Sequence, residues 1–304
     1  MLNVRRLLSS PRSFILSMNN HGLLNFLSDR TNIACMYYAS FGKHLNLKTP
    51  ASFNEKMQWL KLYDRNPLYT RLVDKQAVKE YVSEIIGAQY VIPTYGVWDH
   101  FDDIDFDLLP KQFVLKTTHD GGGAGVIICT DKKELDTEDA KHRLNASLAR
   151  DVYKNLREWP YKNVPHRILA EQLLLNDGRP LQDYKIHCFN GEPKIILVCK
   201  DRYETTGLTE DFYDYNWNHI PVRRPKHPNA NDPIEAPEEL AQMLDLSRRL
   251  SAGIPFVRTD FYLVNHQIYF GEMTFYPTSG YTAFVPDKYD DVFGSWIDLN
   301  MNRQ

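Results

Sequence analysis

A glycine-rich segment, TTHDGGGAG at residues 117–125, joins two apolar runs at 113–116 and 126–129 that have the composition of strands. Glycine lets the backbone approach an anion closely and point N–H groups at it. The segment lacks a GK[ST] ending, and a strand rather than a helix follows it, so neither a Walker A loop nor a dinucleotide fingerprint is indicated. We expect a flap between two antiparallel strands that folds over phosphates, with an ordinary hairpin loop as the alternative.

Two lysines flank this segment in ways that favour the phosphate interpretation. Lys116 ends an apolar strand just before the loop, and a buried ammonium is costly unless it meets an anion. Lys75, in the dipeptide Asp74-Lys75 at the entry to a predicted helix, is a second candidate. Taken alone, Lys75 is more often an ordinary solvated surface residue.

Polar residues interrupt two apolar strands near the C-terminus, FVRTDF at 256–261 and FGEMT at 270–274. In strand alternation Arg258 and Asp260 share one face, as do Glu272 and Thr274. If the strands pair, Asp260 and Glu272 can face each other, and two such carboxylates repel unless a cation bridges them. Oxygen ligands suit magnesium, and Arg258 suits a phosphate group. The alternative is a buried Arg–Asp–Glu ion network.

The register of these two strands decides whether a shared metal site exists. A two-residue turn at Asn265-His266 would pair Asp260 with Gly271 and send Glu272 to the opposite face. A three-residue turn, or a β-bulge, would place Asp260 opposite Glu272. We predict the second arrangement, with the two carboxylates within about 5 Å of each other, Arg258 on the same face and Lys116 directed into the same cleft.

Two further segments carry ionisable residues. Asp183, Lys185 and His187 alternate with apolar residues, which indicates either a polar cleft or an ordinary exposed sheet face. A Pro-rich stretch at 221–237 contains Arg223, Arg224, Lys226 and His227, and its aperiodic sequence suggests a mobile loop that closes on an acidic glycan. A solvated surface excursion explains that stretch equally well.

The elements that must position these residues fall into three regions. Residues 1–90 read as helical, with one helix opening at Phe53 and another from about Leu72 through Val82. Strands follow at about 91, 113–116, 126–129, 168–175, 184–189, 194–199, 256–264 and 267–275, with helices at 131–150 and about 237–252. Asn190-Gly191 predicts a tight hairpin turn. The predicted fold class is therefore α+β.

Composition narrows the function classes. Charged residues make up 25% of the 304 residues and apolar ones 43%, as in soluble globular proteins. A net charge of -3 gives no basic footprint for nucleic acid. Four cysteines without CxxC spacing predict free thiols in a reducing compartment. No run is long enough to span a membrane, and the N-terminal apolar stretch is too interrupted for a cleaved signal peptide.

The N-terminus has a second interpretation. Arg5, Arg6 and Arg12 lie beside Leu7, Leu8, Phe14, Ile15 and Leu16, a pattern that an amphipathic helix on a membrane surface also shows. We expect an ordinary helix packed on the protein and keep peripheral membrane contact as the alternative. The expected location is cytoplasmic in either case, and the oligomeric state is left open.

The order of these segments resembles the TupA-like ATP-grasp family. The likeness rests on FNEKMQWLKLYDRNPLYTRLVDKQAVKEYV, QFVLKTTHDGGGAGVIIC, ILAEQLLL, DYKIHCFNGEPK and FVRTDFYLVNHQIYFGEMTFYPTSG, which together span residues 53–280. The resemblance implies two α+β lobes that clasp ATP. We assign 1–90 to a helical N-terminal region, 91–165 to a small lobe with the flap, and 166–304 to a large lobe with the metal carboxylates.

The resemblance also implies roles for individual residues. Lys75 and Lys116 would contact the ATP phosphates, and the loop glycines Gly121, Gly122, Gly123 and Gly125 would cover them. Glu171, with the main chain of Gln172 and Leu173, matches the adenine-binding segment, and Asp183 and Lys185 fall among the nucleotide-contacting positions. Arg258 would act with Lys116 in catalysis, and Asp260, Glu272 and Thr274 would hold Mg²⁺. Thr274 stands where the family pattern usually has asparagine, which puts a second magnesium ion in doubt, and many relatives carry a Rossmann-like N-terminal domain where this region is helical.

The implied reaction is ATP-dependent formation of an amide from a carboxylate and an amine through an acyl phosphate. The family resemblance points to cell-surface polysaccharide assembly, with an amino acid and a uronic acid as the expected pair. Three alternatives stay open: a phosphotransferase acting on a sugar hydroxyl, a glycosyltransferase, and a degenerate ATP-binding module. A glycosyltransferase would need a nucleotide-sugar site, and this sequence has no DxD motif at a strand end. The acidic segment Asp102-Asp103-Ile104-Asp105 is predicted to lie in a polar turn. Retention of Lys116, Arg258, Asp260 and Glu272 argues against the degenerate module.

Overall fold

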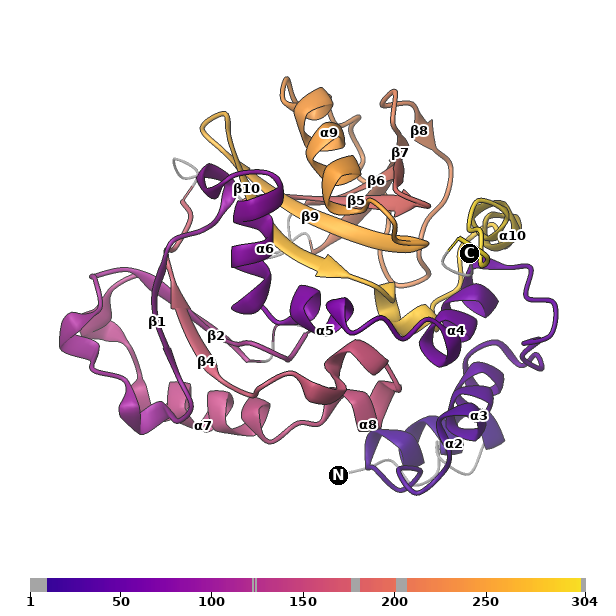
Figure 1. The fold of residues 1–304 in the computed structure, drawn as a ribbon, viewed down its shortest axis with the longest axis horizontal. Helices are drawn as coiled ribbons and strands as arrows, with labels where there is room; N and C mark the ends of the chain where they lie inside the picture. The colour runs from indigo at the N-terminus through magenta and orange to yellow at the C-terminus, as the bar shows by residue number, and fades with distance from the viewer. Residues whose placement is uncertain (1–9, 122, 124, 176–180, 201–206, 302–304) are drawn as a thin grey trace.

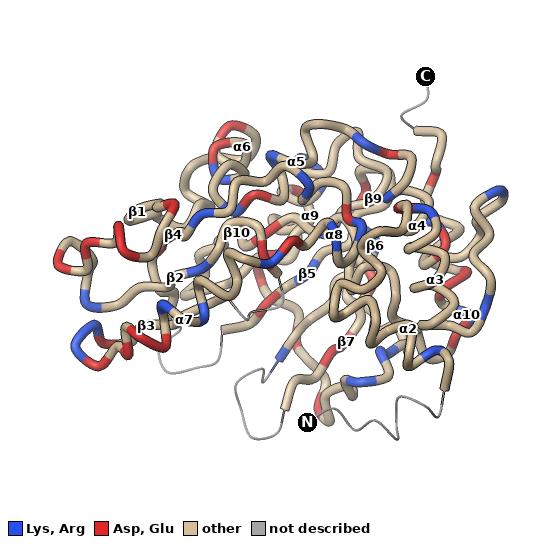
Figure 2. The backbone as a smooth tube through the Cα atoms, turned by 90° about the horizontal axis from the view of Figure 1, so that it is seen from below, with Lys and Arg blue, Asp and Glu red and all other residues tan. Residues whose placement is uncertain are grey.

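Two antiparallel sheets form the frame of the molecule (Figure 1). The computed structural model describes residues 10–301 except 122, 124, 176–180 and 201–206. The strand order is β1-β4-β2-β3 in the four-stranded sheet and β10-β9-β5-β6-β7-β8 in the six-stranded sheet. Seen from below, the four-stranded sheet lies at one end of the molecule and helices α2, α3 and α10 lie at the other (Figure 2).

The four-stranded sheet contains the two strands that flank the glycine-rich segment. Its strands are β1 (Thr94–Trp98), β2 (Phe113–Thr117), β3 (Val126–Cys129) and β4 (Ile168–Glu171). Phe113, Leu115 and Ile168 form its apolar core with Leu144 of α7 (Thr137–Leu148). The side chain of Asp136 accepts the Asp139 N–H and so caps the start of α7.

The six-stranded sheet carries most of the remaining polar candidates. Its strands are β5 (Gln182–Phe189), β6 (Glu192–Lys200), β7 (Thr209–Asp214), β8 (His219–Ile220), β9 (Phe256–Val264) and β10 (Gln267–Thr274). The turn between β5 and β6 is Asn190-Gly191, both with positive φ, as the sequence predicts. Helix α9 (Leu240–Leu250) packs on β5, β6 and β9.

The other helices surround the large sheet and the N-terminal end. They are α2 (Pro11–Asn20), α3 (Asp29–Phe41), α4 (Phe53–Tyr63), α5 (Leu68–Val73), α6 (Ala77–Ile85), α8 (Val152–Leu156) and α10 (Lys288–Ser295). Helix α4 begins with a capping box, in which Ser52 accepts the Glu55 N–H and Glu55 accepts the Ser52 N–H. Phe53, Met57 and Leu60 of α4 are buried in the core of the six-stranded sheet. No helix among the described residues is long and apolar enough to cross a membrane.

Three features differ from the sequence prediction. The strand Ile168–Glu171 pairs with β1 and β2 in the four-stranded sheet, whereas the sequence division placed it with residues 166–304. The helix expected from Leu72 through Val82 is two helices, α5 and α6, because the Asp74 side chain accepts the N–H groups of Gln76 and Ala77 and starts a new helix there. The first strand begins at Thr94 rather than at 91–93. Strand pairing and side-chain caps of this kind are not visible in local periodicity.

Candidate functional site

The glycine-rich loop is anchored at its first residues. The Asp120 side chain is buried; its Oδ1 accepts the Gly121 N–H at 2.8 Å, and its Oδ2 accepts the Ser147 hydroxyl at 2.8 Å. Arg150 adds an ion pair with the same Oδ2 at 3.1 Å. These bonds hold the start of the loop on α7.

Glycine occurs in this loop for two different structural reasons. A Cβ at Gly121 or Gly123 would meet nothing within 4 Å, so the backbone at these two positions borders open space. Gly123 also has a φ of +81°, which favours glycine. At Gly125 a Cβ would lie 2.3 Å from the Ser147 Oγ, so only glycine fits over that hydroxyl. Gly122 and Ala124 lie outside the described residues.

Lys75 projects from the break between α5 and α6 toward this loop. Its backbone N–H donates to the Thr118 carbonyl at 3.0 Å, and its Nζ donates to the Asp120 carbonyl. Burial lowers the pKa of Lys75, while Glu272, on the other sheet, and then Asp120 and Glu171 act to raise it. Lys75 therefore contacts the glycine loop and also interacts electrostatically with Glu272 of β10.

Glu171 gathers two more lysines at the end of β4. Its carboxylate is ion-paired with Lys116 of β2 and with Lys79 of α6, the latter at 2.9 Å. Burial alone would raise the pKa of Glu171, but Lys116 and Lys79 outweigh it and lower that pKa. Sequence reasoning missed Lys79; its position four residues after Lys75, one helical turn on, was the available signal.

The segment Glu171-Gln172-Leu173 leaves the four-stranded sheet on the way to β5 of the six-stranded sheet. The Gln172 N–H donates to the Pro93 carbonyl at 2.9 Å, which ties this connection to the residue before β1. This segment, which starts the connection between the two sheets, is the one for which the family resemblance implies an adenine contact. The Glu171 side chain itself is ion-paired with Lys79 and Lys116.

A β-bulge brings the two candidate metal carboxylates opposite each other. The turn between β9 and β10 has two residues, Asn265 and His266, and pairs Phe270 with Phe261. The register then shifts at Gly271, so that Glu272 lies opposite Asp260 and Thr274 opposite Arg258. The predicted facing is confirmed, and it arises from the bulge rather than from a longer turn.

Arg258 joins these carboxylates directly. Its Nη2 lies 2.6 Å from Asp260 Oδ2 and 3.0 Å from Glu272 Oε1, and its Nε donates to Asp260 Oδ1 at 2.6 Å. Two carboxylates that share one guanidinium nitrogen must lie on the same side of the sheet. Asp260 and Glu272 raise the pKa of Arg258 despite its burial, so the guanidinium stays charged.

Strand β5 supplies the polar partners of β9. Lys185 lies opposite Asp260, and its Nζ is 2.5 Å from Asp260 Oδ2 and 2.6 Å from Asp183 Oδ2. Burial lowers the pKa of Lys185, but Asp260 and Asp183 outweigh that effect and raise it. His187 lies opposite Arg258, and burial together with that arginine lowers the pKa of His187 well below its usual range. All three β5 residues are buried, so the interpretation as an exposed sheet face is wrong.

The donor set at β9 and β10 fits magnesium in its chemistry. Asp260, Glu272 and Thr274 offer oxygen ligands, which Mg²⁺ prefers. The Glu272 side chain is 42% exposed and accepts the Thr274 hydroxyl at 3.2 Å, so it is the accessible carboxylate of the pair. Both Asp260 oxygens are bonded to Arg258 or Lys185, so an ion at Asp260 would compete with these cations.

A buried lysine that the sequence did not single out fixes the loop after β10. Lys61 of α4 donates to the Ser279 carbonyl at 2.8 Å, the Ser279 Oγ at 2.7 Å and the Leu156 carbonyl at 3.1 Å. Gln58, one turn earlier, donates to the carbonyls of Ser279 and Gly280 at 3.1 and 2.9 Å. These bonds hold residues 278–280, all with positive φ, in a conformation that costs free energy for Thr278 and Ser279.

The buried carboxyl of Glu158 completes this cluster. It hydrogen-bonds to the Ser279 side chain, which also accepts from Lys61, so the serine hydroxyl bridges the two ionisable groups. Burial raises the pKa of Glu158 and lowers that of Lys61 to about 7. No motif marks Lys61 in the sequence; it lies on the same face of α4 as Asn54 and Gln58, and all three are buried.

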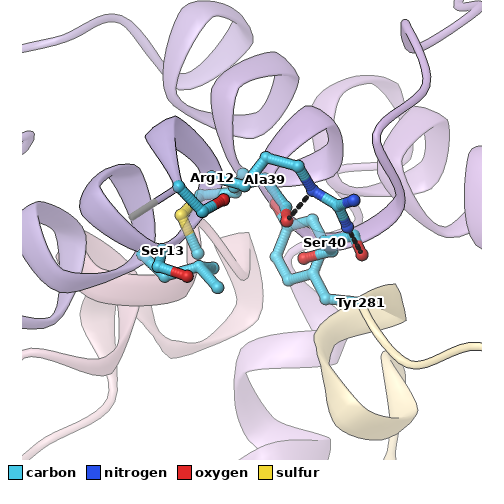
Figure 3. Close-up of a pocket in the computed structure, with 8 residues that line it drawn as sticks. Arg12, Ser13, Ala39, Ser40 and Tyr281 are labelled. Atoms are coloured by element: carbon cyan, nitrogen blue, oxygen red, sulfur yellow. Dashed lines mark hydrogen bonds between the residues drawn. The ribbon is translucent and has the colours of Figure 1, made fainter. Parts of the chain in front are cut away.

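Tyr281, beside this cluster, also faces a pocket at the N-terminal helices (Figure 3). The Lys61 Nζ lies 4.3 Å from the centre of the Tyr281 ring. The pocket has a volume of about 570 Å³, and its lining includes Arg12, Ser13, Ala39 and Ser40. Arg12 closes one side by donating to the carbonyls of Ala39 and Ser40 at 3.0 and 2.7 Å.

The stretch 221–237 packs on the protein more closely than a mobile loop would. Val222 and Ile234 are buried, and Arg223 pairs through its backbone with Val285. Arg224 is largely buried, and its Nε lies 3.6 Å from Glu210 Oε2. The charge of Arg224 contributes to the lowered pKa of His187. The composition suggested a mobile loop because prolines and charged residues predominate in this stretch. The burial of Val222, Ile234 and Arg224 depends on contacts that the local sequence does not show.

The chain was compared with curated proteins and with solved structures. Among curated proteins, no match was found. Solved structures with a similar fold include D-alanine–D-alanine ligase from Helicobacter pylori (14% identity, 76% of this chain and 64% of that chain, TM-score 0.42). The same ligase from Bacillus anthracis (15% identity, 94% and 89%, TM-score 0.45) and a RimK domain ATP-grasp protein from Sphaerobacter thermophilus (10%, 75% and 69%, TM-score 0.41) are also similar. The chain thus spans less than two thirds of the Helicobacter pylori ligase.

The family comparison is more specific. The model of the TupA-like ATP-grasp family matches residues 55–298, which include the glycine loop, the lysines around Glu171 and the Arg258–Asp260–Glu272 group. Cys35, Cys129 and Cys188 are free thiols, in agreement with the sequence prediction for these three residues. With its glycine-rich loop on a four-stranded sheet and the Arg258–Asp260–Glu272 group on a six-stranded sheet, the chain has the α+β ATP-grasp fold and belongs to the TupA-like ATP-grasp family.

Proposed function

We propose that the protein is an ATP- and magnesium-dependent ligase that joins a carboxylate to an amine through an acyl phosphate. The observation that carries the proposal is the position of Lys75. It binds the glycine loop of one sheet while it lies within the field of Glu272 on the other. A triphosphate held under the loop would therefore have its terminal phosphate directed at the Arg258–Asp260–Glu272 group.

Charge neutralisation is the main task of the residues at this site, because a transferring phosphoryl group carries negative charge on its oxygens. Lys75 and Lys116 would contact the phosphates from the loop side, and N–H groups at Gly121 and Gly123 would approach where no side chain intervenes. Arg258 would stabilise the transferred group from the sheet side. Glu171 is ion-paired with Lys116 and Asp260 with Arg258, so bound phosphates would compete with these carboxylates for the two cations.

Asp260 and Glu272, with Thr274 supporting Glu272, would hold Mg²⁺, which would supply positive charge to offset that of the phosphates. The bound carboxylate then attacks the γ-phosphorus, and ADP leaves. The amine nitrogen attacks the resulting acyl carbon, and inorganic phosphate leaves as the amide forms. Main-chain groups of Gln172 and Leu173 between the sheets, together with Asp183 and Lys185, are proposed to contact the adenosine.

The proposed substrates are a uronic acid of a cell-surface polysaccharide and an amino acid, in the cytoplasm. The family name supports an ATP-grasp reaction, and the free thiols of Cys35, Cys129 and Cys188 fit a reducing compartment. Arg224 supports an acidic acceptor, because it brings a second guanidinium into the polar face that contains Arg258 and His187. It is the one residue of the 221–237 segment for which burial and position both suggest a binding role.

Trapping of the acyl phosphate tests the proposal. The protein is incubated with ATP, Mg²⁺, hydroxylamine and glucuronic or galacturonic acid, and hydroxamate, ADP and phosphate are measured. The expected result is hydroxamate with ADP and phosphate in equal amounts, lost in Arg258→Gln. Transfer of phosphate to a sugar hydroxyl, with ADP but neither free phosphate nor hydroxamate, would establish the phosphotransferase instead.

A further inference from the structure

The N-terminal part of the chain has a charge opposite to that of the whole. Residues 1–54 contain six Lys or Arg residues and a single acid, Asp29, whereas the full chain has a net charge of -3. Asp29 is already engaged, with Arg65 at 2.9 Å, Arg157 at 3.5 Å and the Tyr153 hydroxyl at 2.8 Å. Two of the six basic residues, Arg5 and Arg6, precede the described residues. Within residues 10–54 the basic side chains are exposed, and the one acid is paired; the basic residues are Arg12, Arg30, Lys43 and Lys48.

Large apolar side chains are exposed in the same region. Phe14 on α2 is 50% exposed, and Leu23 and Phe26 in the turn after α2 are 58% and 82% exposed. We name these three residues the apolar patch. They lie within thirteen residues of sequence, on a helix and turn at one end of the molecule (Figure 1). Exposure of this much apolar surface has a cost in water, which indicates a binding surface when it gathers in one place.

A buried polar network fixes the turn that carries Leu23 and Phe26 of the apolar patch. Asn32 Nδ2 donates to Asn19 Oδ1 at 2.9 Å, and Asn19 Nδ2 donates to the Asn155 carbonyl at 2.9 Å. Arg157 is buried, and its Nη2 donates to the Asn25 carbonyl at 3.0 Å, next to Phe26. Because these bonds fix the turn on α8 and its surroundings, the exposure of Phe26 is a property of the folded protein and not of a loose end.

We infer that this end of the molecule binds the surface of an anionic lipid bilayer, with the apolar patch inserted among the lipids and the basic residues at the headgroups. Apolar side chains beside an excess of Lys and Arg are the combination that interfacial binding requires. A second copy of the chain fits poorly, because two such faces would bring equally basic surfaces together. The inference is independent of the proposed reaction.

Vesicle co-sedimentation with the full chain tests the inference. Vesicles of phosphatidylcholine alone are compared with an equal mixture of phosphatidylcholine and phosphatidylglycerol, at low and high salt. We expect binding to the anionic vesicles, weakened by salt, and a loss of about tenfold or more in the partition coefficient for Leu23→Ser/Phe26→Ser, because each buried large apolar side chain is worth about tenfold in equilibrium.

Leu108 provides a matched control. It is 82% exposed, as Phe26 is, but it follows a segment with Asp102, Asp103, Asp105 and Asp107. Leu108→Ser should leave vesicle binding unchanged, and circular dichroism should show that all variants are folded. Absence of binding to anionic vesicles by the wild-type chain, or equal loss in Leu108→Ser, would overturn the inference. So would a wild-type dimer, seen by light scattering, that Leu23→Ser/Phe26→Ser converts to monomer without a change in vesicle binding.

Discussion

Replacement of Lys61 by methionine tests the cluster behind the loop at residues 277–280. Methionine has nearly the same length, so the cavity left behind is small, but three hydrogen bonds are lost and Glu158 is left buried without its cation. Removing one partner of a buried charged pair costs about 3–5 kcal/mol. Proton uptake by Glu158, whose pKa burial already raises, relieves part of this cost, so we expect about 3 kcal/mol.

A double-mutant cycle measures the coupling. Lys61→Met/Glu158→Gln removes both charges and should recover at least about 1 kcal/mol of the free energy of unfolding relative to the sum of the single variants. Urea denaturation gives these values, with equal m-values as the check that the unfolded states are comparable. Strict additivity of the two single variants would refute the idea that Lys61 and Glu158 act as one unit through Ser279.

The contribution of Lys61 to the free energy of unfolding should depend on pH, with a sign that follows from its pKa. Burial lowers the pKa of Lys61 to about 7, whereas an unfolded lysine titrates near 10.4. Between these values the unfolded chain binds more protons, so the Lys61 contribution to stability rises with pH through this range. Glu158 acts in the opposite sense at lower pH. Wild type should therefore gain stability relative to Lys61→Met from about pH 7 to about pH 9, and a flat difference in that range would exclude a titrating Lys61.

Four further predictions concern the nucleotide and the acceptor. Lys116→Ala should weaken MgATP binding by at least about tenfold in calorimetry without unfolding the protein, since it deletes one of the lysines paired with Glu171; unchanged affinity would remove it from the site. The nucleotide product should be ADP with phosphate, and stoichiometric AMP in chromatography would exclude an acyl phosphate. Gly125→Ala should cost about 1–3 kcal/mol because its Cβ would overlap the Ser147 hydroxyl, whereas Gly121→Ala, which borders open space, should cost little in thermal unfolding. Neutralising Arg223, Arg224 and Lys226 should raise the apparent KM for an acidic acceptor and leave that for ATP nearly unchanged; equal effects on both would count against a role in acceptor binding.

Local sequence was sufficient for the elements and for the type of site. Strand composition around TTHDGGGAG, the Asn190-Gly191 turn and the alternation of Arg258 with Asp260 depend on neighbours a few residues apart, and the structure has all three features. Order and spacing of these segments were specific enough to identify the family. The chemistry of the site could therefore be stated, although its residues remain proposals for ATP and magnesium binding.

Tertiary structure decided what depends on partners far away in sequence. The facing of Asp260 and Glu272 arises from a bulge at Gly271, and the sequence allowed either register because a slip of one residue leaves the local alternation intact. β4 pairs with β1 and β2 across long stretches of chain, so no local pattern showed which sheet it joins. Lys61 is an ordinary helical lysine by sequence, and only the packing of Ser279, Leu156 and Glu158 around it makes it a buried cation, since burial is a property of the assembled fold.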